Sequence, residues 1–208
     1  LTDLSIPLFA TFVGLQLVHE LGHLVTAGAN GIKTSSPTFV PSIITGITSS
    51  VTSLKSPPKN KAALFDFAIS GPLAGMIASV FAIALGSQLT TVADPTMFPA
   101  LPLEILRQST LGGGIIENIL GSGALGVPEG ALGTAGVASM TVALHPVAIA
   151  GYISLIVNAL AVLPIGTTDG GRAAIALFGR GSKILIGNIF FAAILFIGLF
   201  GGSDLFLF

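Results

Sequence analysis

Residues 4–28 read LSIPLFATFVGLQLVHELGHLVTAG. This stretch is apolar and long enough to cross a bilayer as a helix, which takes about 20 residues. It is interrupted by Gln16 and, in its last third, by the run HELGH at residues 19–23. Ionisable side chains inside a membrane span cost about 2.5 to 3.5 kcal/mol each on insertion scales, so the run indicates a functional site.

The composition of the whole chain is that of a membrane protein. Among its 208 residues, 52% are hydrophobic and only 8% are charged, against about 25% charged residues in a soluble domain. The net charge is −1 without a dense basic run, which argues against a nucleic-acid partner. Cysteine is absent, so a metal ion would have to be held by His and carboxylate groups.

Three further apolar stretches have the length of membrane spans, at about residues 66–89, 142–163 and 184–200. We therefore predict an all-α polytopic membrane protein with about four transmembrane helices. Residues 1–208 are interpreted as a single domain. Because the chain begins at Leu1 without a targeting signal, we interpret it as a fragment or processed form of a longer protein.

The connections between these spans differ in composition. Residues 39–47 read FVPSIITGI, which is too apolar for a simple exposed loop and predicts a short β-hairpin or re-entrant segment after the first span. Pro72 either kinks the second span or marks its start. Residues 90–141 are rich in Gly and predict loops with short helices at the membrane surface.

Loop charges predict an orientation, because Lys and Arg concentrate on the cytoplasm-like side of a membrane. The first and third connections carry most of them, namely Lys33, Lys55, Lys59, Lys61, Arg172, Arg180 and Lys183. The second connection carries Arg107 against Asp94, Glu104, Glu117 and Glu129. Four spans place the first and third connections on one face, so the end of the first span and the residues after the third can meet there.

The HELGH run has the spacing of a catalytic zinc site. His19 and His23 are four residues apart, so on a helix they project from one face and can present two imidazole nitrogens to one ion. Glu20 is close enough to take a proton from a metal-activated water without being a ligand. With three His and four Glu in the chain, a chance match to H-E-x-x-H has a probability of about one in a thousand.

A catalytic zinc usually takes three protein ligands and leaves its fourth position for water. Asp169 is the candidate for the third, because it lies at the same predicted face in a Gly-rich turn where the backbone can approach a neighbour. His145 lies at the opposite end of the third span, which favours a role at the helix start or on the substrate path over metal binding. Two alternatives stay open: a polar patch that packs helices together, and a metal site without protease activity.

Three blocks of the sequence resemble the site-2 proteases, and among them the plastid and cyanobacterial membrane metalloproteases associated with chloroplast development. The first block spans residues 17–31 and contains HELGH, the most specific of the motifs. The second is FDFAISGPLAG at residues 65–75. The third runs from His145 to LPIGTTDGGR at residues 163–172.

The resemblance implies an intramembrane zinc metalloprotease with a catalytic core of three helices. In it Zn²⁺ is held by His19, His23 and Asp169, and Glu20 is the general base. The resemblance also implies a membrane-spanning protein substrate that is cut within the bilayer, and we expect residues 39–47 to pair with it as an added strand. The implied location is a plastid membrane, thylakoid or envelope, or a cyanobacterial membrane, and the oligomeric state is left open.

The chain departs from the family pattern at two positions. The family usually has Asn three residues before the Pro that corresponds to Pro164, where this chain has Ala161; its own Asn158 lies about one helical turn earlier. If the family Asn holds the substrate or polarises its carbonyl, either Asn158 substitutes for it from the same helix face or activity is weakened. Thr168 stands where an apolar residue is usual. Two rivals therefore stay open: an inactive homologue that binds membrane clients, and a metal transporter or sensor, although a transporter would normally show polar groups along several spans.

Overall fold

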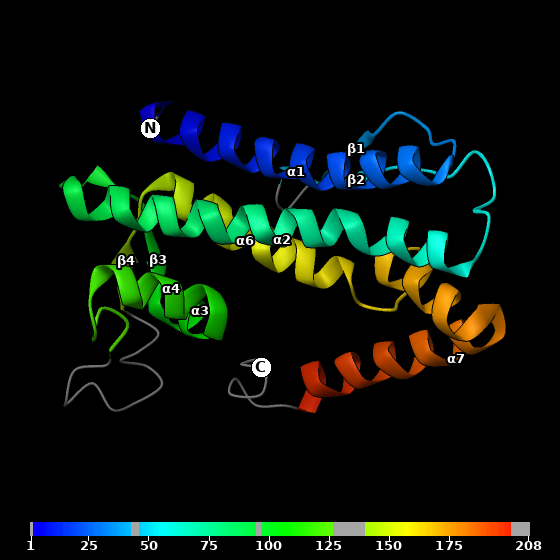
Figure 1. The fold of residues 1–208 in the computed structure, drawn as a ribbon. Helices are drawn as coiled ribbons and strands as arrows, with labels where there is room; N and C mark the ends of the chain where they lie inside the picture. The colour runs from blue at the N-terminus through cyan, green and yellow to red at the C-terminus, as the bar shows by residue number, and fades with distance from the viewer. Residues whose placement is uncertain (1, 43–45, 95–96, 127–139, 201–208) are drawn as a thin grey trace. The chain divides into compact units, whose positions relative to one another are not determined.

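The computed structural model describes residues 2–42, 46–94, 97–126 and 140–200. Most of them are helical, and Figure 1 shows the order of the elements along the chain. The helices are α1 (Thr2–Asn30), α2 (Lys61–Val92), α3 (Leu103–Arg107), α4 (Thr110–Leu120), α6 (Pro146–Ala161) and α7 (Asp169–Phe200). The strands are β1 (Thr38–Ser42), β2 (Gly46–Val51), β3 (Ala100–Pro102) and β4 (Thr141–Ala143). The prediction of a mainly helical polytopic membrane protein is confirmed.

Three of these helices are long and apolar enough to cross a membrane, over Leu4–Asn30, Lys61–Val92 and Asp169–Ile197. The predicted third span is represented by α6, which has 16 residues and is shorter than the roughly 20 that a straight crossing needs. It is short because the helix begins at Pro146, while residues 141–143 belong to β4. The predicted number of about four spans thus corresponds to three long helices and one short apolar helix among the described residues.

The segment after α1 forms a β-hairpin, in which β1 pairs antiparallel with β2. This confirms the hairpin alternative for residues 39–47, of which residues 43–45 lie outside the described part of the chain. The next helix, α2, begins at Lys61 and runs through Pro72. The interpretation of Pro72 as the start of the second span is therefore wrong.

The Gly-rich segment at residues 90–141 contains the two short helices α3 and α4, as predicted, and also a small antiparallel sheet of β3 and β4. This sheet could not be predicted, because strands of three residues carry no periodic pattern. The predicted loops at residues 127–139 lie outside the described residues.

Two compact units make up the fold. Unit 1 comprises Leu1–Phe12, Ser79–Ile153 and Ile197–Phe208. Unit 2 comprises Val13–Ala78 and Ser154–Phe196. All of the predicted metal and catalytic residues lie in unit 2, and the single domain predicted for the chain stays a prediction.

Glycines bring the helices close together within each unit. In unit 1, α2 meets α6 at Gly86, where an added Cβ would overlap the backbone nitrogen of Ala148. In unit 2, α1 meets α2 at Gly22, where an added Cβ would lie 2.5 Å from the carbonyl oxygen of Ser70. Small residues are typical of such close contacts between membrane helices.

Gly179 divides α7 into two helical segments, because its φ of 85° and ψ of 172° are not helical. The first segment begins at Asp169. The second contains the predicted fourth span, and its large apolar side chains are mostly exposed, among them Ile184, Leu185, Phe191 and Leu195. Exposed apolar surface of this kind is expected of a helix that faces lipid.

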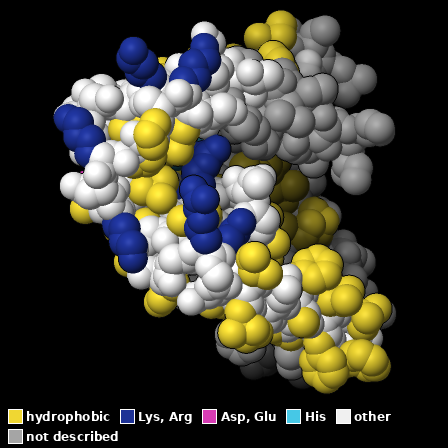
Figure 2. All heavy atoms as spheres, turned by 90° about the vertical axis from the view of Figure 1, so that its right-hand side faces the viewer, with side chains coloured by type: hydrophobic (Ala, Val, Ile, Leu, Met, Phe, Trp, Pro, Cys, Tyr) yellow, Lys and Arg dark blue, Asp and Glu magenta, His cyan; other side chains and the backbone are white. Residues whose placement is uncertain are grey.

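Figure 2 shows a face of the molecule on which Lys and Arg side chains gather. Of the eight Lys and Arg side chains in the chain, only Arg107 belongs to unit 1. The connection from α1 to α2 and the first residue of α2 contribute exposed lysines to unit 2, namely Lys33, Lys55, Lys59 and Lys61. That the first and third connections lie on one face of a membrane stays a prediction.

Candidate metal centre

Helix α1 carries three of the predicted site residues. His19, Glu20 and His23 are buried, with 7%, 2% and 2% of their surfaces exposed. The histidines are one helical turn apart, and their Nε2 atoms lie 3.1 Å from each other. Because polar side chains buried in an apolar helix are costly without partners, the contacts that they make within unit 2 define the site.

Asp169 lies at the first position of α7. The preceding residue, Thr168, caps this helix, because its hydroxyl oxygen accepts a hydrogen bond from the Gly171 amide at 3.0 Å. Gly170 leaves no room for a side chain, since an added Cβ would overlap the carbonyl oxygen of Val162. These contacts fix the start of the helix and with it the carboxylate of Asp169.

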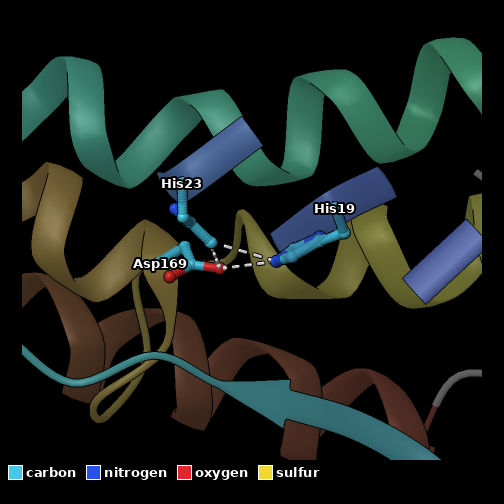
Figure 3. A group of neighbouring side chains, drawn as sticks. All are labelled: His19, His23 and Asp169. Carbon is cyan, nitrogen blue, oxygen red and sulfur yellow. Dashed lines mark hydrogen bonds and ion pairs between the residues drawn. The ribbon is translucent and has the colours of Figure 1, made fainter. Parts of the chain in front are cut away.

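The structure brings His19, His23 and Asp169 together (Figure 3). Oδ2 of Asp169 lies 3.4 Å from Nε2 of His19 and 3.3 Å from Nε2 of His23. In a tetrahedral zinc site with bonds of about 2.0–2.1 Å, two ligand atoms are about 3.3 Å apart. The group therefore has the dimensions of three ligands around one zinc ion.

Hydrogen bonds fix the tautomer of both imidazole rings. Nδ1 of His19 lies 2.6 Å from Oδ1 of Asn158, and Nδ1 of His23 lies 2.7 Å from the carbonyl oxygen of Phe67. Both oxygens can only accept, so each Nδ1 is a donor, and in this tautomer the lone pair of the ring lies on Nε2. Three electron-rich atoms then face one another, an arrangement that a cation between them stabilises. The donor set and its hydrogen-bonded partners fit Zn²⁺.

Glu20 follows His19 in the chain but is not one of the three converging residues. Its Oε2 accepts a hydrogen bond from the hydroxyl of Thr52, the residue that follows β2. Its Oε1 is buried and has no partner among the described residues. A buried carboxylate oxygen without a partner is costly, so Oε1 is the atom of this carboxylate that is available to a water or a substrate group.

Arg172 links the two acidic residues of the site. Its Nη1 donates to Oδ1 of Asp169 at 2.9 Å, and its Nη2 donates to the carbonyl oxygen of Thr52 at 3.1 Å. Charge-assisted contacts of this kind are directional and strong. Arg172 therefore orients the carboxylate of Asp169 so that its other oxygen faces the histidines, and it joins this ligand to the residue that holds Glu20.

A comparison with protein families shows what kind of protein carries this group. Residues 7–201 match the model of Peptidase family M50. The chain belongs to this family. No solved structure matches the M50 chain.

Curated relatives of the M50 chain are named as zinc metalloproteases. It is 33% identical over 185 residues to "Probable zinc metalloprotease EGY1, chloroplastic" of Arabidopsis thaliana, a match that covers 89% of the chain and 32% of the relative. It is 31% identical over 199 residues to the protein of the same name from Oryza sativa subsp. japonica, with 95% and 32% covered. It is 32% identical over 195 residues to "Probable zinc metalloprotease EGY2, chloroplastic" of Oryza sativa subsp. indica, with 91% and 31% covered. The chain thus spans about a third of the length of these relatives.

The remaining histidine of the M50 chain, His145, lies in unit 1 just before α6. Its Nδ1 accepts a hydrogen bond from the Val147 amide at 3.2 Å, and its own backbone amide donates to the Thr90 hydroxyl at 2.9 Å. Burial lowers the pKa of its imidazole, which keeps the ring a neutral acceptor near pH 7. These contacts support the predicted role at the helix start.

The predicted ligands converge in the structure. The hydrogen bonds by which other residues hold these ligands and Glu20 were not predicted. Thr52 carries no signal in the sequence, because a Thr after a strand is common. Asn158 and Arg172 carry a weak one: Asn158 is a polar residue inside an apolar helix, and Arg172 follows Asp169 at a spacing that places both on one helix face.

Proposed function

We propose that this chain is the membrane-embedded catalytic part of a zinc metalloprotease that hydrolyses peptide bonds within membrane-spanning segments of other proteins. One observation carries the proposal: three atoms with the spacing of zinc ligands converge among apolar helices, next in the chain to a buried carboxylate with one unpartnered oxygen. Membership of peptidase family M50 and the names of the relatives support it.

In this proposal, His19, His23 and Asp169 would hold Zn²⁺ through one ligand atom each. When bound, the ion supplies Lewis acidity, which polarises the scissile carbonyl and makes water a stronger acid. Glu20 takes a proton from the attacking water at Oε1 and passes it to the nitrogen of the leaving amine. Thr52 holds the other oxygen of Glu20 in place during both transfers.

The hairpin of β1 and β2 is the proposed binding edge for the substrate. A transmembrane helix hides its carbonyls in hydrogen bonds, so it must be locally extended before it is cut. An extended segment can add to the hairpin as a further strand, and β2 leads directly into Thr52, the residue that holds Glu20. Substrate would thereby be placed next to the base.

Replacement of residues 39–47 by a flexible Gly/Ser linker of equal length is expected to abolish cleavage of a single-span substrate. Bound zinc should stay near the wild-type level, because the metal group, that is His19, His23 and Asp169, lies on other elements. Cleavage and zinc content are measured on the same preparation. Cleavage at the wild-type rate would show that the hairpin does not bind the substrate.

We propose a plastid membrane, or the corresponding cyanobacterial membrane, as the location of the protein. The relatives that match over most of the chain are named as chloroplastic, and three helices of the chain are long and apolar enough to cross a membrane.

Zinc content and cleavage together test the proposed function. The purified protein in detergent or liposomes is expected to contain about one zinc per chain and to cut some of a panel of single-span reporter substrates. A chelator should abolish cleavage, and one equivalent of zinc should restore it. Zinc without cleavage of any substrate would favour a binding or transport role, and a chain without zinc would overturn the site.

His23→Ala is expected to remove zinc and cleavage together. Deletion of a ligand should weaken zinc binding by more than the roughly 10–100-fold that loss of a ligand's hydrogen-bond partner costs. His145→Asn is the matched control, because it retains an acceptor before α6 and lies outside the metal group; it should keep its zinc. Elemental analysis of both purified variants checks this, and equal zinc contents would contradict the assignment.

A further inference from the structure

Asn158 lies within α6 and is buried, with 1% of its surface exposed. Its Oδ1 accepts a hydrogen bond from Nδ1 of His19 at 2.6 Å. Its Nδ2 donates to the carbonyl oxygen of Ser154, one helical turn earlier, at 2.8 Å. A carbonyl can only accept, so the amide nitrogen must face Ser154 and the amide oxygen must face His19.

Helix α2 packs against this amide and has a glycine at the point of contact. Gly75 faces Asn158 so closely that an added Cβ would overlap its Oδ1. The amide is therefore enclosed by a neighbouring helix as well as hydrogen-bonded on both sides. Close packing of this kind restricts a side chain to one rotamer.

We propose that Asn158 is a positioning residue for His19, and this inference rests on the zinc site of the proposed function. Asn158 keeps the ring proton on Nδ1 and thereby directs the lone pair of Nε2 to the point where His23 and Asp169 converge. Both polar atoms of the amide are engaged, since Nδ2 also lies 3.3 Å from the Ser154 hydroxyl. Asn158 therefore acts on the ligand and leaves no unbound donor for a substrate carbonyl.

The second histidine provides an internal comparison. Nδ1 of His23 donates to the backbone carbonyl of Phe67, a contact that depends on the position of α2 and is present whatever side chain Phe67 carries. His19 depends on a side chain instead. Substitution of Asn158 should therefore release one ligand and leave the other in place.

Zinc affinity of the full chain in detergent, measured by competition with a chromophoric chelator, tests this role. Asn158→Leu has a similar shape but no acceptor, and it is expected to weaken zinc binding by about 10–100-fold. The absorption spectrum of the Co²⁺-substituted protein should change as well, because it reports the geometry of the ligands. Asn158→Asp keeps an acceptor for the His19 proton and should bind zinc within about tenfold of the wild type.

Gln16→Met is the matched control. It removes a buried amide from α1, about one helical turn before His19, and the nitrogen of this amide has no partner among the described residues. Wild-type zinc affinity is expected.

The outcomes separate this inference from the proposed function. Folded Asn158→Leu with the zinc affinity and cobalt spectrum of the wild type would overturn the positioning role. If thermal melting shows that Asn158→Leu does not fold, the zinc affinity of Asn158→Asp is the test of the positioning role. Loss of zinc from the folded Asn158→Asp variant would overturn this role. A wild-type chain that binds no zinc would instead overturn the proposed function.

Discussion

Glu20→Gln is expected to slow peptide cleavage by about 10²–10⁴-fold, the contribution of a general acid–base group, while the zinc content stays at the wild-type level. Glutamine keeps the shape of the side chain and an oxygen for the Thr52 hydroxyl, but it cannot take a proton from water. Metal binding should be unaffected, because Glu20 is not among the three converging residues. The measurement is the initial rate of cleavage of a single-span reporter in liposomes, with zinc determined on the same sample.

Glu104→Gln is the matched control for this change. It makes the same chemical substitution in α3, which belongs to unit 1 and lies outside the metal group. Wild-type cleavage and zinc content are expected. A Glu20→Gln protein that cuts at more than about a tenth of the wild-type rate would place the base elsewhere.

Gly71→Ala is expected to weaken zinc binding by at least about 100-fold, although Gly71 itself binds nothing. An added Cβ at this position would overlap Nε2 of His23 and would lie 2.5 Å and 2.6 Å from the ring carbons Cδ2 and Cε1. The ring is held in this place by its hydrogen bond to the Phe67 carbonyl, which a displacement of the ring would disturb. One methyl group should thus displace a ligand, and chelator competition measures the loss.

Gly14→Ala separates this local effect from a general effect of replacing helical glycines. Gly14 lies in α1, and nothing lies within 4 Å of a Cβ added there. This variant should keep its zinc and gain up to about 1 kcal/mol in free energy of unfolding, because Ala favours a helix over Gly. Zinc affinity of the wild-type level in Gly71→Ala would contradict the packing of α2 against His23.

The metal group could be predicted because its signals need little knowledge of packing. His19 and His23 are recognised by their spacing within one helix. Asp169 required one further step, the charge pattern that places the first and third connections on one face. Membrane topology thus supplied the long-range information that a soluble chain would not have offered.

The residues that support the group could not be predicted in the same way. Thr52 and Asn158 contact Glu20 and His19 across 32 and 139 positions of the chain. Such contacts depend on how closely the helices approach. Gly71 and Gly75 permit this close approach because they have no side chain. The length of α6 escaped prediction for a related reason, since hydropathy does not distinguish the apolar strand β4 from the start of an apolar helix.

The capped turn between α6 and α7 also determines where the protein can be labelled. Connecting segments usually accept an epitope tag or a fluorescent group, but this one is tied to the helix by Thr168 and has no room for a side chain at Gly170. An insertion there would shift Asp169. The turn after α4 is the better place for a label, because it belongs to unit 1 and exposes Gly121, Ser122 and Gly123.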